Sequence, residues 1–98
     1  MADLIFSRDC LVHLSFDAAL CVVANFKRSG AKYLLTTTFT QRDRNNDLIG
    51  KDQFWRPLNL QLSPFSFPAP VLLIDEGGTE ELGQYPDKCL GLWLLEDL

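Results

Sequence analysis

The stretch DLIFSRDCLVHLSFDAALCVVANFKRSGAKYLLTTTF, residues 3–39, decides the fold class of the chain. It begins with Leu-Ile-Phe at residues 4–6, a continuous apolar run that is typical of a strand covered on both faces of a parallel sheet. Apolar residues then recur at the i, i+3, i+4 and i+7 spacing of a helix face. This spacing predicts a helix over residues 16–28, with Ser15 as its N-terminal cap. Residues 32–39, KYLLTTTF, are rich in β-branched and aromatic types and predict a second strand.

The remaining residues complete a small α/β domain. A strand, a helix and a strand joined by short links form a βαβ unit, in which we expect parallel strands and a crossover that is right-handed in nearly all known cases. Residues 40–53 are polar, and residues 54–70 hold four of the five prolines, so a long irregular segment follows. Its aromatic side chains favour an ordered, packed segment. Residues 71–75, VLLID, and 89–95, CLGLWLL, predict two strands that pair as an antiparallel hairpin. We expect a single domain over residues 1–98.

Composition and charge exclude several classes of function. The chain has 98 residues and a net charge of −4, and its nine Lys and Arg residues form no basic stripe, so we expect no nucleic-acid partner. No apolar run approaches the length of a membrane-spanning helix and no export signal is recognisable, so we expect a cytoplasmic protein without a membrane partner. The three cysteines are far apart, and the one histidine has no cluster of acids with ligand spacing. We therefore expect neither disulfides nor a metal site.

The order of elements resembles the C-terminal half of the class I S-adenosylmethionine-dependent methyltransferase fold, which is Rossmann-like. In that family the fourth strand commonly begins with aspartate and is followed by a leucine-histidine pair, and DLIFSRDCLVHL at residues 3–14 is similar. Residues 15–39 are similar to the following helix and fifth strand, where a basic helix end and a glycine precede the strand. The segments 71–75 and 89–95 resemble the sixth and seventh strands, of which the seventh is antiparallel in the family. The resemblance covers nearly the whole chain.

The chain departs from this family at the cofactor site. The glycine-rich turn after the first strand and the acid that ends the second strand have no counterpart here. The one glycine pair, Gly77-Gly78, follows a late strand without a helix after it and is interpreted as a plain turn. The resemblance therefore implies a parent enzyme that transfers a methyl group from S-adenosylmethionine to an unknown acceptor. It also implies an incomplete domain that binds no cofactor alone, whose missing half a separate chain could supply.

Two candidate catalytic residues lie after the first strand. Ligands of open parallel sheets bind beyond the carboxyl ends of the strands, where Arg8 and Asp9 are expected. Asp9 could accept a proton or orient a nucleophile while Arg8 binds an anionic substrate group; a local ion pair or a helix cap explains the same residues. His13 is the second catalytic candidate because its ordinary pKa lies near neutrality. Its apolar neighbours favour a packed or capping histidine instead.

Further substrate-binding candidates come from later segments. Thr38, at the end of the second strand, could reach the same rim as Arg8, although β-propensity alone explains the threonines at 36–38. In FWRPLNLQL the side chains of Trp55, Arg56 and Asn59 could line a substrate pocket, because the family resemblance places a cover there. The alternative is that this segment fills core space.

The missing half has a consequence for association. In the family the fourth strand lies between the first and the fifth, so strand 3–7 of this chain would have one unpaired edge. An apolar free edge invites another chain, and we predict a homodimer in which two copies of this strand pair antiparallel about a two-fold axis. Two rival interpretations are a non-enzymatic α/β protein-interaction module, which binds through a sheet edge or the proline-rich segment, and a small hydrolase that uses Asp9 and His13.

Overall fold

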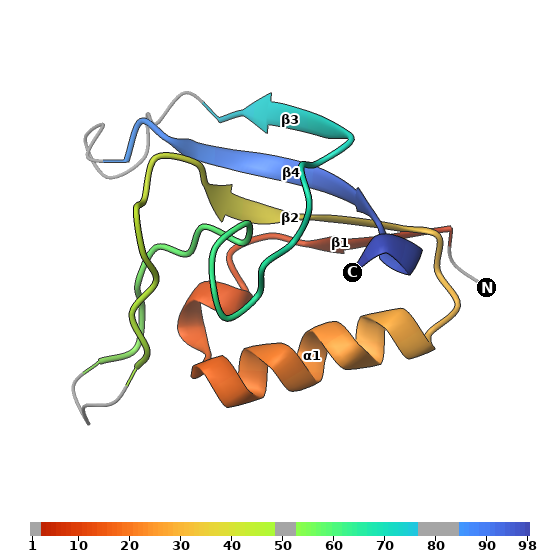
Figure 1. The fold of residues 1–98 in the computed structure, drawn as a ribbon, viewed down its shortest axis with the longest axis horizontal. Helices are drawn as coiled ribbons and strands as arrows, with labels where there is room; N and C mark the ends of the chain where they lie inside the picture. The colour runs from red at the N-terminus through yellow and green to blue at the C-terminus, as the bar shows by residue number, and fades with distance from the viewer. Residues whose placement is uncertain (1–2, 49–52, 77–84) are drawn as a thin grey trace.

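The computed structural model describes residues 3–48, 53–76 and 85–98 of the chain. Its elements follow one another in the order shown in Figure 1. They are β1 (Leu4–Ser7), the short helix η1 (Leu11–His13), α1 (Phe16–Arg28), β2 (Tyr33–Phe39), β3 (Leu72–Asp75), β4 (Lys88–Leu94) and the short helix η3 (Leu95–Asp97). Among the described residues, no helix combines the length and hydropathy that a membrane span needs.

The strands form one mixed sheet in the order β1-β2-β4-β3. β1 and β2 are parallel neighbours connected through α1, which confirms the predicted βαβ unit. β3 and β4 are antiparallel neighbours, as the predicted hairpin requires, and β4 is also antiparallel to β2. β4 therefore lies inside the sheet, while β1 and β3 are its two edges.

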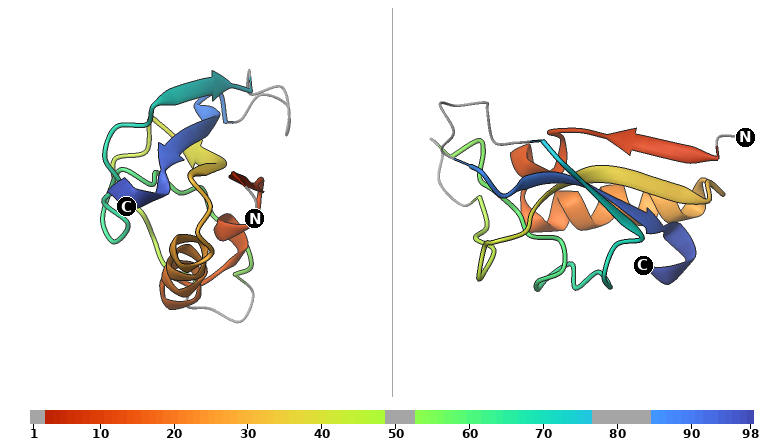
Figure 2. Two further views of the ribbon diagram at one scale, coloured as in Figure 1. Left: turned by 90° about the vertical axis from the view of Figure 1, so that its right-hand side faces the viewer. Right: turned by 90° about the horizontal axis from the view of Figure 1, so that it is seen from above.

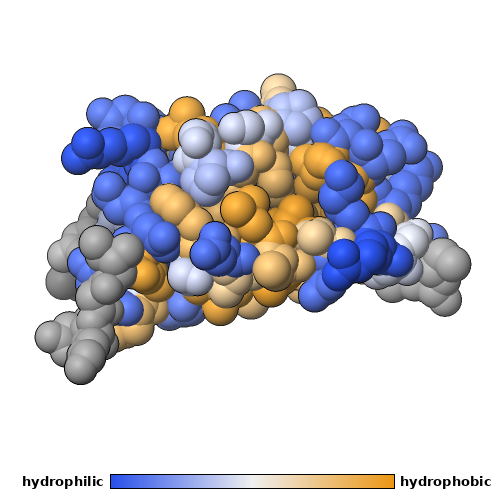
Figure 3. All heavy atoms as spheres, turned by 60° about the horizontal axis from the view of Figure 1, so that its bottom comes forward, coloured by the Kyte–Doolittle hydropathy of each residue, from blue (hydrophilic) through white to orange (hydrophobic). Residues whose placement is uncertain are grey.

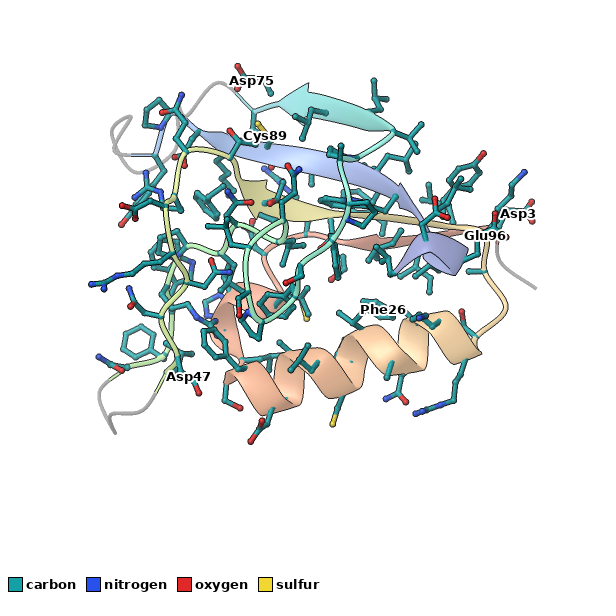
Figure 4. All side chains as sticks on the ribbon, viewed as in Figure 1. Asp3, Phe26, Asp47, Asp75, Cys89 and Glu96 are labelled. Atoms are coloured by element: carbon teal, nitrogen blue, oxygen red, sulfur yellow. The ribbon has the colours of Figure 1, made fainter. Side chains whose placement is uncertain are left out.

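Helix α1 has the predicted bounds, and local chemistry explains both ends. The Ser15 hydroxyl accepts a hydrogen bond from the Ala18 N–H at 3.2 Å, which satisfies one of the free donors of the first turn. A second donor, the Phe16 N–H, bonds to the Asp47 carboxylate at 2.9 Å and so ties the later loop to the helix (Figure 4). After the helix, Gly30 has a φ of 81°, a left-handed conformation that glycine adopts without strain.

One face of the sheet carries the core. Helix α1 and the segment 54–70 lie on this side (Figures 1 and 2), and Phe26 points from α1 toward the sheet (Figure 4). Phe65 and Phe67 of the irregular segment are buried and pack edge-to-face on each other at 6.2 Å. The segment is therefore packed, as its aromatic content predicted, although Phe54 is exposed. The buried centre consists of Leu11, Val12, Ala19, Val23, Ala31, Leu34, Phe39, Leu58, Leu60, Phe65, Phe67, Trp93 and Leu95.

The opposite face, called the open face below, carries no described helix (Figure 2), and the turn after β1 covers only its end at Thr37. Side chains of directly paired residues share a face, so the register places a set of apolar side chains there. The expectation that β1 is covered on both faces is therefore wrong for this chain, because nothing described packs on its second face and both Leu4 and Phe6 are exposed. The open face consists mainly of Leu4, Phe6, Tyr33, Leu35, Leu72, Ile74, Leu90, Leu92 and Leu94.

The outer surface of α1 also carries apolar residues. Figure 3 shows apolar side chains over the middle of the side that holds the helix, between more polar regions. Leu20 and Cys21 are exposed there, while Ala19 and Val23 face the core.

Candidate functional site

Four charged residues meet at the carboxyl end of β1, at the end of the open face. This ionic cluster consists of Arg8, Asp9, Glu76 and Lys88. The Lys88 ammonium lies 2.9 Å from the Asp9 carboxylate, and Arg8 donates to the Glu76 carboxylate at 2.5 Å. Arg8 is only loosely paired with Asp9, at 3.9 Å. The cluster thus lies where the sequence placed Arg8 and Asp9, but the main partners of these two residues come from β4 and from the end of β3.

Asp9 has the most unusual backbone of the cluster. Its φ of 56° is left-handed, a conformation that costs energy for residues other than glycine and that aspartate tolerates better than most. The Asp9 N–H donates to the Thr37 hydroxyl at 2.9 Å, which fixes this turn against β2. Strained residues held by their surroundings are frequent at binding sites. The Asp9 carboxylate is partly exposed and paired with a nearly buried ammonium, and Asp9 stays a candidate for a binding or catalytic role.

The second catalytic candidate, His13, lies in a different environment. It ends η1, and its ring is exposed. Its Nδ1 lies 2.7 Å from the Phe54 carbonyl oxygen, so Nδ1 carries the proton and donates. No hydrogen bond joins His13 to Asp9 in the part of the chain that the structure describes. Asp9 and His13 are therefore not held together as an acid–base pair, which the hydrolase interpretation would require.

Arg56 is the most enclosed of the predicted substrate-binding residues. Its Nε donates to the Asn46 carbonyl at 2.7 Å, and its Nη1 donates to the carbonyls of Leu11 and Val12 at 3.2 and 3.0 Å. The guanidinium also lies 5.3 Å from the ring centre of Phe16. Burial lowers the pKa of Arg56, and the charge of Asp47 acts in the opposite direction. These contacts hold η1 and two loops together.

Arg56 and Trp55 line an open cavity of about 430 Å³. Its other described lining residues are Asn46, Asp47, Leu48 and Gln53. The Trp55 ring also packs edge-to-face on Phe39 and Tyr85, with centroid distances of 6.1 and 5.1 Å. Two of the predicted pocket residues are therefore neighbours at one cavity, although Arg56 also has a structural role.

Thr38 and Asn59 bond to the irregular segments of the chain. Thr38 is buried and its hydroxyl accepts from the Leu60 N–H at 3.1 Å. The Asn59 amide donates to the Arg42 carbonyl at 3.2 Å, and its backbone N–H donates to the Asn45 side chain at 2.8 Å. Both residues thus join the irregular segments to the core.

The threonine that reaches the rim is Thr37, one position earlier than the predicted Thr38. Thr37 shares its face with Leu35, which pairs with Phe6 next to the end of β1. Side chains alternate between the two faces of a strand, so Thr37 could be recognised as the rim residue once the pairing of β2 with β1 was known.

A second ion pair, between Arg42 and Asp87, was not singled out from the sequence. The Arg42 Nε and Nη2 atoms each donate to the Asp87 carboxylate at 3.0 Å, and the Gln41 N–H adds a third bond at 3.1 Å. Burial alone would raise the pKa of Asp87, but the hydrogen bonds from Arg42 and Gln41 outweigh it and hold the pKa below its ordinary value. This pair fastens the end of β2 to the start of β4.

Substitution of Asp87 by asparagine is expected to lower the free energy of unfolding at neutral pH by about 2 kcal/mol, because it breaks a charge-assisted bidentate pair. The folded-state pKa of Asp87 is depressed, so its contribution is fully present above the unfolded value of about 3.9 and is lost as the pH falls through the folded-state pKa. Urea unfolding at neutral and acidic pH should therefore show the difference between wild type and Asp87→Asn shrinking in acid. The control is Asp43→Asn at an exposed site. An equal difference at both pH values would contradict this role.

The described residues contain no group of three side chains that could hold a metal ion. Cys10, Cys21 and Cys89 are free thiols. Burial, with the nearby charge of Asp75, raises the pKa of the Cys89 thiol, which keeps it protonated and inert. Figure 4 shows Cys89 and Asp75 at the same end of the sheet.

No protein-family model, curated protein or solved structure matches the chain. What the chain does must be inferred from its own residues and their arrangement.

Proposed function

We propose that this chain is the C-terminal half of a class I S-adenosylmethionine-dependent methyltransferase domain, and that it has no methyltransferase activity alone. The observation that carries the proposal is the sheet arrangement. A parallel β1–β2 pair is joined through α1, the last strand is antiparallel, and β1 is an edge with one side unpaired. That free side is where the family resemblance puts the cofactor-binding half.

The open face supports the same proposal. Sheets of this parallel, doubly wound type bury both faces under helices, and their strands are apolar on both sides. Here α1 and residues 54–70 cover one face, while Leu4 and Phe6 remain exposed on the other. An uncovered apolar face beside an unpaired edge is what a sheet cut from a larger domain would present.

The described residues do not fit S-adenosylmethionine. Of the described glycines, Gly30 ends α1 and Gly91 lies under the Trp93 ring, and neither belongs to a turn between a strand and a helix. Gly77-Gly78 lies outside the described residues. We therefore assign no methyl-transfer step to this chain, because such a reaction needs donor and acceptor held in line.

The ionic cluster would contribute to the substrate side of the parent domain. Asp9 and Arg8 lie at the carboxyl end of β1, and Trp55 and Arg56 line the cavity. In this proposal Asp9 orients or deprotonates the acceptor, and Arg8 binds an anionic group once Glu76 is displaced. Thr38, Asn59 and His13, the other candidates, keep the structural bonds described above.

Calorimetric titration with S-adenosylmethionine and S-adenosylhomocysteine tests the absence of a cofactor cradle. We expect no saturable binding of either compound by the folded chain, because no described glycine turn admits the cofactor. Circular dichroism on the same sample confirms that the protein is folded. Saturable binding at micromolar concentration would contradict the proposal.

We also propose that the chain forms a homodimer through the free edge of β1. The Tyr33 N–H donates to the Asp3 carbonyl at 2.9 Å, so Asp3 bonds toward β2. Because backbone groups alternate along a parallel strand, those of Leu4 and Phe6 point to the free edge. A two-fold axis at Ile5 then places Leu4 of each copy opposite Phe6 of the other.

Phe6→Pro is expected to abolish pairing at β1 while leaving the β1–β2 ladder intact, because proline removes only the outward N–H. Phe6→Ala is the matched control, since it shortens the side chain but keeps that donor. Sedimentation velocity should show a weaker association for Phe6→Pro than for Phe6→Ala. Equal association of these two variants would exclude the β1 edge.

The open face also favours a second candidate function, a non-enzymatic module that binds a protein through its sheet. The proline-rich segment is a poor binding element in this candidate, because Phe65 and Phe67 are buried and the Trp93 indole N–H donates to the Pro68 carbonyl at 2.7 Å. A peptide of sequence PFSFPAP is therefore expected not to displace any partner. Displacement by this peptide would show that the segment leaves the core.

A further inference from the structure

The second edge of the sheet, β3, is more exposed than β1. The consecutive residues Val71, Leu72, Leu73 and Ile74 are 61%, 52%, 44% and 43% exposed. These apolar side chains point to both faces of the sheet, and among the described strands β3 pairs with β4 alone. Natural edge strands usually carry charges, prolines or bulges that prevent pairing. β3 carries one such residue, Asp75 at its end, and the Val71 N–H just before it already bonds to the Leu92 carbonyl at 2.7 Å, so the unprotected stretch is Leu72–Ile74.

The backbone of β3 is oriented to accept another strand. The Glu76 N–H donates to the Lys88 carbonyl at 3.2 Å, toward β4. Backbone groups alternate between the two sides of an antiparallel strand, so those of Leu73 point to the free edge. Leu73 therefore offers one donor and one acceptor, which is the self-complementary pair that a two-fold axis at this residue requires.

The charge pattern favours a second copy of this chain as the partner. With the axis at Leu73, Leu72 of one copy lies opposite Ile74 of the other. Val71, which lies opposite Asp75, adds no donor to the pairing because its N–H bonds to the Leu92 carbonyl at 2.7 Å. The two acidic residues, Asp75 at the end of β3 and Glu76 just after it, then lie at opposite ends of the paired strands in the two copies. No like charges face each other, and apolar side chains meet on both faces.

We propose that two copies of this chain pair antiparallel through β3, with Leu73 at the two-fold axis. This pairing does not depend on the proposed methyltransferase origin. If β1 also pairs, each copy has two self-complementary edges at opposite sides of its sheet, so each added copy extends the sheet and leaves a new free edge. The chain would then form a series of oligomers that lengthens with concentration, because contacts of this size are weak.

Charge substitutions at the axis test the pairing. In the Phe6→Pro background, where β1 pairing is removed, Leu73→Lys or Leu73→Glu puts like charges opposite each other and is expected to weaken association by about tenfold or more. An equimolar mixture of these two variants is expected to restore a heterodimer, because opposite charges then meet. Leu20→Lys, at an exposed site on α1, is the control and should leave association unchanged. Sedimentation velocity over a concentration series is the measurement.

A second readout uses the unmodified chain. Amide hydrogen exchange at Leu73 is expected to slow as protein concentration rises, while exchange at Leu20 stays constant. A Phe6→Pro chain that is monomeric throughout, a mixture that associates no better than its separate components, or concentration-independent exchange at Leu73 would each overturn the proposal. None of these outcomes bears on cofactor binding, so a failure of β3 pairing is distinguishable from a failure of the proposed function.

Discussion

Replacement of Trp93 by alanine is expected to lower the free energy of unfolding by about 3–5 kcal/mol, the range for a large buried aromatic side chain. Trp93 is buried on β4 and packs edge-to-face on Phe67 at 5.2 Å. Its indole N–H donates to the Pro68 carbonyl at 2.7 Å. The side chain thus fastens the irregular segment to the sheet. For a domain whose total stability is typically 5–15 kcal/mol, this loss leaves little margin. Urea unfolding followed by circular dichroism measures it.

Gly91 provides a specific test of the position of the Trp93 ring. A Cβ at Gly91 would lie 2.5 Å from two ring atoms of Trp93, so Gly91→Ala forces the ring to move and is expected to cost about 1–3 kcal/mol. In the Trp93→Ala background the ring is absent, and Gly91→Ala should cost much less. The double-mutant cycle is therefore expected to be strongly non-additive. Additive losses would mean that the ring does not cover Gly91.

The elements that local patterns determine were predicted well. The spacing of apolar residues in 16–28 and the Ser15 cap fixed α1, since both signals lie within the helix and its first turn. The parallel β1–β2 pair followed from the strand–helix–strand order, because a helix between two strands usually serves as the crossover of a parallel pair. The hairpin of β3 and β4 followed from two apolar runs, with β4 spanning Lys88–Leu94 rather than 89–95.

Features that depend on the packing of distant segments were not predictable. The insertion of β4 between β2 and β3, which makes β3 an edge, depends on the whole sheet. The sequence pattern of β1 also indicated burial on both faces. An apolar run shows that both faces of a strand can be buried, but it does not show whether the chain has a second layer to cover them.

The candidate site shows the same division. Arg8 and Asp9 were placed correctly because the end of β1 is a local feature. Their partners Lys88 and Glu76 come from segments far along the chain, as does Asp87 for Arg42, so no short motif could reveal them. Arg56 was interpreted as a pocket residue, with the alternative that its segment fills core space. The structure places Arg56 at a cavity while its guanidinium donates to backbone carbonyls.

Arg56→Lys is expected to lower the free energy of unfolding by about 2–4 kcal/mol. The guanidinium donates to three backbone carbonyls, on Asn46, Leu11 and Val12, in directions that a single ammonium cannot reproduce. Carbonyls left buried without a donor cost about 1–3 kcal/mol each, offset in part by new bonds to the lysine. Arg44→Lys, at an exposed site, is the matched control and should change stability by less than about 0.5 kcal/mol.

This substitution separates the two interpretations of Arg56. If Arg56 holds η1 and the two loops together, Arg56→Lys should lower the free energy of unfolding even without a ligand. Hydrogen exchange should then become faster at Val12 and in residues 45–48 in particular. As a substrate ligand alone, it should be replaceable by lysine at little cost in stability, since lysine keeps the positive charge. Urea unfolding of Arg56→Lys with the stability of wild type would therefore exclude the structural role and return Arg56 to the substrate side of the proposed parent enzyme.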